Sequence, residues 1–129
     1  MDNPIDDELL DAVRWVESSG GKYLLSKAGA RGAYQFMPAT AKSYNVNPTD
    51  ADETDDRAGA RQLLIDEFKA LGSIELALAA YNAGRPAVIR AINKAGSREW
   101  DVVKGHLPEE TRDYIPKIFA AKKLRSTRS

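Results

Sequence analysis

The sequence predicts an all-α fold, and three observations support this prediction. No segment sustains the alternation of polar and apolar residues that is typical of a half-buried strand. Apolar residues recur instead three and four positions apart, which is the spacing of one face of a helix. Proline, serine and glycine residues, which favour helix ends, stand between these stretches. We therefore expect a mainly helical domain.

The first helix is expected to begin near Pro4, because proline is tolerated in a first turn, with Asp2 or Asn3 as its cap. Its apolar residues share one face: Ile5, Leu9, Val13 and Val16. The run Ser18-Ser19-Gly20-Gly21 should end this helix. Glu17 is then placed in the last turn, close to the apolar face.

Further helices are predicted over residues 38–44, 55–71, 74–83, 86–94 and 108–123. Gly72, Gly84 and Gly96 are expected to end three of them, and Ser73 is expected to cap the helix that begins at residue 74. This helix, IELALAAYN, is apolar almost all round, so we expect it to be the central one.

The chain length, net charge and cysteine count restrict the possible functions. The chain has 129 residues, which suggests one domain, and its formal net charge is zero, which argues against a coat for DNA or an anionic membrane. It has no cysteine, so disulfides and thiolate metal sites are excluded. No run approaches the roughly 18 apolar residues of a transmembrane segment. We expect a catalytic domain over residues 1–122 and a basic, disordered tail over 123–129.

Metal chemistry is not expected. The acidic segment Asp50–Asp56 lacks the turn glycine and the late Glu of a calcium loop. His106 is the only histidine, which excludes a zinc site with several imidazoles and disfavours a Ser-His nucleophile. We expect no metal and no small-molecule cofactor.

The stretch ESSGGKYLLSKAGARGAYQFMP, residues 17–38, places one carboxylate before a glycine-rich run and a group of hydrogen-bonding side chains. A solvated helix end needs no such surroundings, whereas a site that grips a polar polymer beside a proton donor does. Three more segments belong with it: Gly32–Pro38, Ala80–Gly84 and Glu110–Ile115.

On these residues the chain resembles the catalytic domain of soluble lytic transglycosylases, which are related in fold to goose-type lysozyme. Four motifs occur in the order of that family: Glu17-Ser18; G-x-x-Q-x-M-P at Gly32, Gln35, Met37 and Pro38; A-Y-N-A-G at Ala80–Gly84; and E-T-x-x-Y at Glu110, Thr111 and Tyr114. Two departures are mild. The family commonly has Leu or a similar residue at Tyr34, and Arg85 stands between A-Y-N-A-G and Pro86.

The resemblance implies a compact lysozyme-like helical domain with a glycan-binding cleft. It also implies cleavage of the β-1,4 bond between N-acetylmuramic acid and N-acetylglucosamine in peptidoglycan, with Glu17 as single general acid and base. The muramic acid C6 hydroxyl closes a 1,6-anhydro ring. Glu17 must then be protonated near neutral pH, although its ordinary pKa is about 4.3, so burial is expected to raise that pKa. Val13, Val16, Met37 and the alanines of residues 77–80 are candidates for the apolar wall.

The resemblance also implies roles for other residues. Tyr81 is expected to point its hydroxyl at the carboxyl group or the scissile bond. The expected substrate-binding residues are Ser26, Tyr34, Gln35, Met37, Asn82, Glu110 and Tyr114. Gln35 offers a donor and an acceptor to an N-acetyl or hydroxyl group, and Met37 offers a soft surface to a sugar face.

Three alternatives stay open. A lysozyme-type muramidase on the same fold would hydrolyse the bond, with Asp50, Asp52, Asp55 or Asp56 positioning water. A non-catalytic glycan-binding module would keep the motifs without the activity. A small nucleic-acid binder would use the basic tail, and salt-dependent DNA binding would reveal it.

The setting follows from the substrate. The expected partners are peptidoglycan glycan strands, and the expected place of action is the periplasm or cell wall. The acidic N-terminal stretch lacks the positive region of a secretory signal. We therefore expect a monomer that is carried in a phage virion or delivered by a larger secretion machine.

Overall fold

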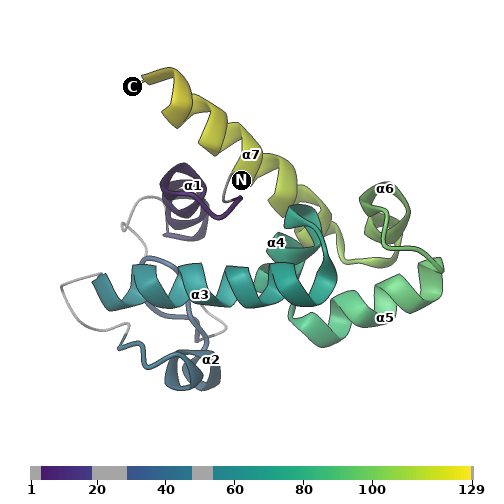
Figure 1. Ribbon diagram of the computed structural model, residues 1–129, viewed down its shortest axis with the longest axis horizontal. Coiled ribbons are helices and arrows are strands. Elements are labelled where there is room, and N and C mark those ends of the chain that lie inside the picture. Colours follow the sequence, from purple (N-terminus) through teal and green to yellow (C-terminus); the bar gives the residue numbers. More distant parts are fainter. Residues whose placement is uncertain (1–3, 19–28, 48–53, 129) are drawn as a thin grey trace. The chain divides into compact units, whose positions relative to one another are not determined.

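The computed structural model describes residues 4–18, 29–47 and 54–128, which form mainly helices (Figure 1). The α-helices are α1 (Asp7–Ser18), α2 (Pro38–Ser43), α3 (Thr54–Leu71), α4 (Ile74–Ala83), α5 (Arg85–Ala95), α6 (Trp100–Val103) and α7 (Glu109–Arg128), with a 3₁₀ helix η1 (Lys104–His106). Within the described ranges the extended backbone forms a single isolated bridge, between Arg31 and Phe36. The predicted all-α class is confirmed.

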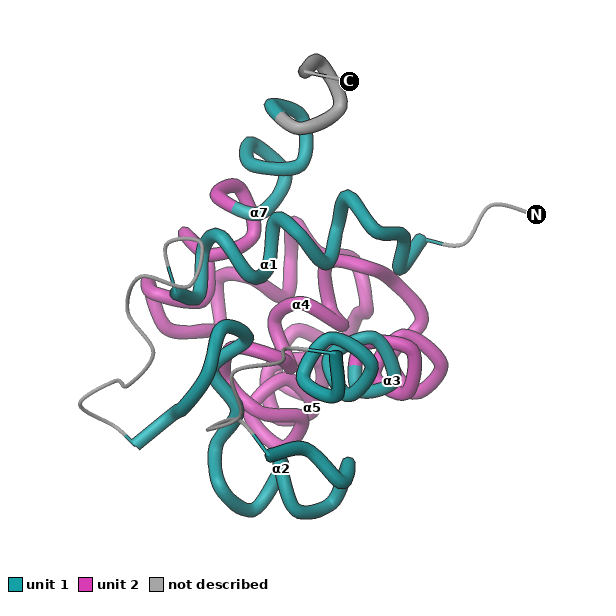
Figure 2. Tube along the Cα trace, turned by 90° about the vertical axis from the view of Figure 1, so that its left-hand side faces the viewer, with its two compact units in different colours: residues 1–63, 118–129 teal, residues 64–117 magenta. Residues whose placement is uncertain are grey.

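The chain divides into two compact units (Figure 2). Unit 1 consists of residues 1–63 and 118–129, and unit 2 consists of residues 64–117. Two helices contribute to both units, because α3 passes residue 63 and α7 passes residue 117. The expected division between a catalytic domain and a basic tail after residue 122 stays a prediction.

The apolar face of α1 helps to form the core of unit 1. Leu9, Leu10, Ala12 and Val13 are buried, and so is Ile5, which precedes the helix. The predicted start near Pro4 is wrong, because Asp6 is the N-cap: its carboxylate accepts a hydrogen bond from the Leu9 N–H at 2.9 Å. α1 runs to Ser18, and the residues Ser19, Gly20 and Gly21 that were expected to end it lie outside the described residues.

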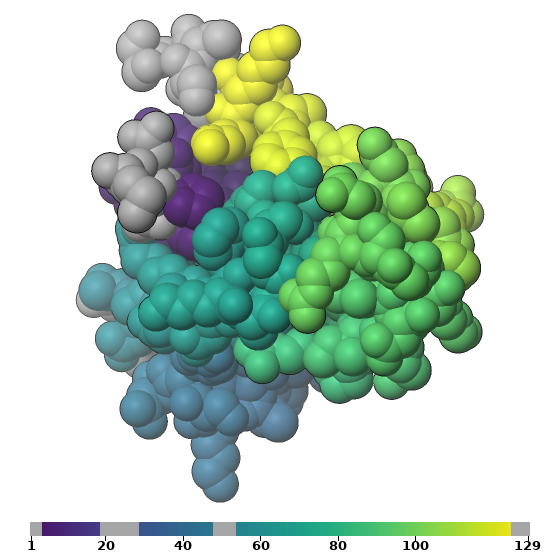
Figure 3. Space-filling view, turned by 45° about the vertical axis from the view of Figure 1, so that its right-hand side comes forward, coloured from purple at the N-terminus to yellow at the C-terminus, as the bar shows by residue number. Residues whose placement is uncertain are grey.

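In unit 2, α4 carries a continuous run of buried residues from Leu76 to Ala80. α4 is thus buried on all sides over these five residues, whereas its expected place at the centre of the fold stays a prediction. Ser73 caps α4 as predicted, with its hydroxyl oxygen accepting from the Leu76 N–H at 3.2 Å. α4 packs against α5, and α5 packs against α6 and η1. Figure 3 shows α5 and α6, in green, on the exposed surface of this unit.

Glycines separate the helices of unit 2. Gly84 ends α4 and precedes α5 with φ +91° and ψ +144°, a conformation that is accessible mainly to glycine. Gly96 ends α5 in the left-handed region, at φ +65°.

Two features of unit 2 and the C-terminus differ from the sequence-based expectations. α6 and η1 were not predicted, because a helix of four residues carries no periodic pattern. α7 continues to Arg128 rather than ending near Lys123. None of the helices in the described part of the chain is long and apolar enough to span a membrane.

Candidate active site

The predicted site residues fall in both units. Unit 1 contains Glu17, Tyr34, Gln35 and Met37, and unit 2 contains Tyr81, Asn82, Glu110 and Tyr114. Ser26 lies outside the described residues, as do Asp50 and Asp52. The structure therefore describes two partial sites, one in each unit.

Glu17 is a half-buried residue in the last turn of α1, as predicted. Ser18 follows it as the last helical residue; it is fully buried and donates its hydroxyl to the Arg14 carbonyl at 3.0 Å. Of the residues expected to surround the carboxyl group, Val13 is buried and Val16 is half-buried. The carboxyl group thus projects from a regular helical backbone rather than from a loop.

A tight turn over residues 31–36 carries two of the predicted contacts. The Arg31 and Phe36 backbones exchange two hydrogen bonds of 2.9 Å. At the tip, Gln35 has a positive φ of +53°, and its N–H donates to the Gly32 carbonyl at 3.1 Å. The Gln35 side-chain nitrogen donates to the same carbonyl at 2.8 Å. This hydrogen bond orients the amide group and uses one of its two N–H donors, so that its oxygen can accept from a ligand.

Tyr34 is the largest fully buried side chain of the described residues, with only 1% of its surface exposed. Its hydroxyl accepts a hydrogen bond from the Arg57 guanidinium at 2.8 Å. Burial raises the pKa of this hydroxyl, so it stays protonated at neutral pH. Because Tyr34 is buried, a structural role in supporting the 31–36 turn is favoured, rather than the predicted contact with substrate.

Arg57 is a residue of this site that the sequence did not reveal. It extends from α3 and binds Asp11 of α1 at 2.8 Å, in addition to Tyr34. It also approaches the Asp7 carboxylate at 3.2 Å. Partial burial opposes its charge, but the hydrogen bonds to Asp11 and Tyr34 raise the pKa of Arg57 above its ordinary value. Arg57 thus ties the helix that carries Glu17 to the turn that carries Gln35.

Met37 follows this turn and precedes α2. Its backbone is extended, with φ −71° and ψ +148°, and the helix begins at the next residue, Pro38. Its side chain is 46% exposed, which is unusual for a large apolar residue. An exposed thioether at this position is available for contact with a sugar face.

In unit 2, a hydrogen bond joins two of the motifs. Thr111 of α7 is buried, and its hydroxyl donates to the Asn82 side-chain oxygen of α4 at 2.8 Å. Tyr81, next to Asn82, is half-buried. Tyr114 is buried on α7, whereas Glu110 is exposed in the first turn of that helix. The hydrogen bond from Thr111 thus orients the Asn82 side chain. Of the two predicted contacts on α7, Glu110 and Tyr114, Glu110 is the exposed one.

Arg85, the residue that departs from the expected motif, pairs with a buried carboxylate. Its guanidinium makes two contacts of 3.0 Å with Glu67 of α3, from Nε to Oε2 and from Nη2 to Oε1. The Glu67 side chain is only 8% exposed, and the Arg85 side chain is 41% exposed. This pair fixes the start of α5, directly after the A-Y-N-A-G segment, against α3.

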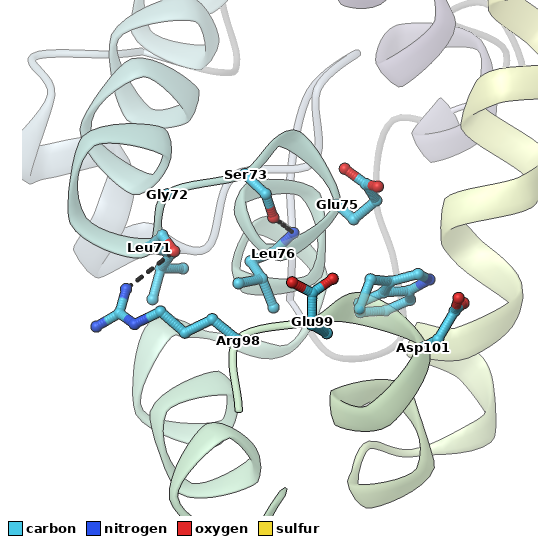
Figure 4. Close-up of a pocket in the computed structure, with 9 residues that line it drawn as sticks. Leu71, Gly72, Ser73, Glu75, Leu76, Arg98, Glu99 and Asp101 are labelled. Atoms are coloured by element: carbon cyan, nitrogen blue, oxygen red, sulfur yellow. Dashed lines mark hydrogen bonds between the residues drawn. The ribbon is translucent and has the colours of Figure 1, made fainter. Parts of the chain in front are cut away.

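A pocket of about 360 Å³ lies elsewhere in unit 2 (Figure 4). Glu75, Glu99 and Asp101 contribute carboxylates to its lining, and the Arg98 guanidinium donates to the Leu71 carbonyl at 2.9 Å. It lies at the N-terminal end of α4, whereas Tyr81 and Asn82 lie near the other end. This pocket contains none of the predicted site residues.

No group of three or more His, Asp or Glu side chains is arranged to hold a metal ion in the ranges that the structure describes. Asp55 is exposed and Asp56 is buried, both in the first turn of α3. The two partial sites together offer carboxyl, amide, hydroxyl and thioether groups, and the thioether is that of Met37 in unit 1.

Comparison with known proteins gives consistent results. Residues 2–103 match the family described as Transglycosylase SLT domain. The membrane-bound lytic murein transglycosylase D of Escherichia coli (strain K12) is 33% identical over 113 residues, which are 81% of this chain and 25% of that protein. A transglycosylase of Enterobacteria phage PRD1 is 41% identical over 81 residues, which are 62% of this chain and 30% of that protein. The chain spans about a quarter of the length of the first of these relatives.

The family match covers most of the predicted site. Glu17, Gln35, Met37 and Tyr81 lie within residues 2–103, and so does Asn82. Glu110 and Tyr114 lie beyond the matched range, so their roles rest on the fourth motif alone.

Proposed function

The chain belongs to the transglycosylase SLT domain family, and on this premise we propose that it is a peptidoglycan lytic transglycosylase. It cuts the β-1,4 bond between N-acetylmuramic acid and N-acetylglucosamine and leaves a 1,6-anhydromuramic acid end. The family match over residues 2–103 carries this proposal, because it includes the only carboxylate that the mechanism requires. Both relatives are transglycosylases by name, which agrees with it.

In the first step, Glu17 acts as a general acid. Its proton passes to the glycosidic oxygen, the bond from that oxygen to the anomeric carbon breaks, and the muramic acid ring acquires oxocarbenium character. The departing strand leaves with a free hydroxyl on its N-acetylglucosamine. A carboxyl group that is held by a helical backbone, as Glu17 is, meets the positional demand of this transfer.

In the second step, the Glu17 carboxylate acts as a general base. It takes the proton of the C6 hydroxyl on the same muramic acid, and the oxygen bonds to the anomeric carbon. This closes the anhydro ring and returns Glu17 to its protonated form. Because the substrate supplies the nucleophile, no second carboxylate is needed to position water.

We propose roles for the neighbouring residues as follows. Tyr81 directs its hydroxyl at the carboxyl group or the scissile bond. Gln35 and Met37 hold sugar rings, because Gln35 presents an amide oxygen and Met37 an exposed thioether.

Asn82, oriented by Thr111, makes a further polar contact with the glycan. Ser26, Glu110 and Tyr114 contact the substrate at its periphery, and Tyr34 supports the turn from below.

The Glu17→Gln variant tests the assignment of the acid. An amide cannot donate and recover the proton, so release of soluble fragments from purified peptidoglycan should fall by at least about a thousandfold. Cosedimentation with the same peptidoglycan should be retained, because the shape of the side chain is nearly unchanged. Cleavage by Glu17→Gln at near the wild-type rate would refute the mechanism.

The Tyr81→Phe variant tests the role of the hydroxyl. We expect kcat to fall about tenfold or more while KM changes little, because the hydroxyl acts on the reacting groups and not on the rest of the glycan. The matched control is Tyr44→Phe, which removes the hydroxyl group of a tyrosine outside the predicted site. Equal kinetics of wild type and Tyr81→Phe would assign Tyr81 to packing.

We propose the bacterial cell wall as the place of action, since the substrate occurs there. The phage relative supports delivery by a virion, in which the domain opens a path through the wall. Detection of the protein in purified virions tests this setting. Its absence from virions, together with export by the producing cell, would favour a secretion machine or envelope enzyme instead.

A further inference from the structure

A second pocket lies in unit 1, beside the turn of residues 31–36. Its volume is about 550 Å³, within the usual range for ligand sites. Phe36, Pro38, Ala41 and Val46 form an apolar wall. The segment from Gly29 to Asn47, drawn in blue, lies at the surface in Figure 3.

The wall of this pocket rests on the backbone of α3. A Cβ atom added at Gly59 would clash with the Val46 side chain and lie 3.3 Å from the Phe36 ring. The close approach of these side chains to Gly59 fixes their position. The apolar surface is therefore part of the packed structure of unit 1 rather than a loose arrangement of side chains.

Two cations also line the pocket, Arg31 and Lys42. Both are exposed, and neither makes an ion pair with a carboxylate among the described residues. Arg57 and Arg61, in the same unit, are by contrast bound to Asp7. The pocket thus combines an apolar wall with two positive charges that have no carboxylate partner among the described residues, which favours an anionic ligand with small alkyl groups.

The pocket adjoins the proposed sugar contacts along the chain. Gln35 and Met37 are assigned to the glycan, and the residues that alternate with them, Phe36 and Pro38, line the pocket. The pocket and the proposed sugar contacts therefore share one short segment of the chain, residues 35–38.

We propose that this pocket binds the peptide stem of peptidoglycan, with Arg31 and Lys42 holding stem carboxylates and the apolar wall receiving the alkyl side chains. The inference rests on the proposed function and deepens it. Stems branch from the muramic acid residues of the glycan, carry free carboxylates and contain alanine methyl groups. The stem carboxylates thus match the two cations of the pocket, and the methyl groups match its apolar wall. The enzyme then prefers strands that bear stems over bare glycan.

The test compares two substrates and two variants. The substrates are purified peptidoglycan freed of other anionic polymers, and the same glycan after an amidase has removed its stems. Arg31→Ala/Lys42→Ala should lose about tenfold in kcat/KM on stem-bearing strands and less than twofold on bare strands. The control, Arg90→Ala/Lys94→Ala, removes two exposed cations from α5 and should change neither value. Circular dichroism should show that both variants are folded.

A binding measurement separates this proposal from the proposed function. Glu17→Gln should cosediment more strongly with stem-bearing than with bare strands, and the two pocket substitutions should remove the difference. This result is expected even if the wild type cleaves neither substrate, which would refute only the proposed function. Amidation of the stem carboxylates should weaken binding as the pocket substitutions do.

Three outcomes would overturn the proposal. One is an equal loss on stem-bearing and bare strands, and another is a preference for stems that survives both the substitutions and amidation. The third is a wild-type dimer, seen by sedimentation, that the pocket substitutions dissociate, because the pocket would then be a contact between two copies of the chain.

Discussion

Arg57 holds together the part of unit 1 that carries Glu17. Its guanidinium reaches two carboxylates of α1 and the hydroxyl of Tyr34, and these contacts join α3 to α1 and to the 31–36 turn. Charge-assisted hydrogen bonds of this kind contribute more to stability than neutral ones. Arg57 therefore positions the helix and the turn that carry the residues proposed to act on the substrate.

Replacement of Arg57 tests this role. Arg57→Ala should lower the free energy of unfolding by about 2 kcal/mol, because several partly buried charge-assisted bonds are lost together. The control Arg90→Ala, at an exposed position of α5, should lower it by less than about 0.5 kcal/mol. Urea unfolding followed by circular dichroism measures both values. A loss for Arg57→Ala no larger than for the control would show that the network adds little.

The sequence predicted some site residues and not others for a physical reason. Glu17, Gln35 and Tyr81 stand in short motifs, so neighbouring residues identify them. Arg57 gains its importance from partners 46 and 23 positions away, and no local pattern carries that information. Tyr34 was assigned to the substrate because it stands inside a motif, but its 1% exposure depends on the tertiary packing of unit 1.

At the level of secondary structure, the helix ends are set by the capping residues in the local sequence. Ser73 and the glycines at 84 and 96 were predicted from sequence and occupy caps in the structure. The start of α1 was misplaced because several polar residues compete for the cap, and the carboxylate that reaches Leu9 N–H belongs to Asp6. α6 is too short to show a period, and its place beside α5 is set by packing.

Gly84 and Gly96 should differ in their tolerance of a side chain. Gly84→Ala should lower the free energy of unfolding by roughly 2 kcal/mol, since φ +91° with ψ +144° lies in a region nearly restricted to glycine. Gly96→Ala should cost about 1 kcal/mol, because its left-handed conformation is accessible to other residues with moderate strain. Equal losses, measured by urea unfolding, would contradict this account of the α4–α5 junction.

The pair between Glu67 and Arg85 should show the cost of an unpaired buried carboxylate. Arg85→Met should lower the free energy of unfolding by about 2 kcal/mol, because the buried Glu67 side chain loses its guanidinium partner and has little access to water. Glu67→Met combined with Arg85→Met removes the buried carboxyl group as well, so the double variant should be more stable than the single one. A double variant that is less stable than Arg85→Met would contradict this explanation.

At the scale of the whole molecule, the all-α class was predictable because helical periodicity is a local signal, whereas the two units were not. Unit 1 combines residues 1–63 with 118–129, and no sequence pattern links segments so far apart. The predicted acid belongs to unit 1 and the predicted tyrosine to unit 2. The roles proposed for Glu17 and Tyr81 therefore concern residues of different units.

The muramidase alternative differs from the proposed function in the fate of one bond. If water attacks the anomeric carbon, the product has a reducing muramic acid end, and an acidic residue such as Asp55 or Asp56 would have to position that water. If the C6 hydroxyl attacks, the product has an anhydro end and no water is consumed. The two products differ in mass by one water molecule.

Mass spectrometry of the fragments that the wild-type protein releases from purified peptidoglycan tests the central claim most directly. The account predicts fragments that end in 1,6-anhydromuramic acid, with no reducing muramic acid ends above the level of untreated material. Fragments that end in reducing muramic acid would contradict it and identify the protein as a hydrolase.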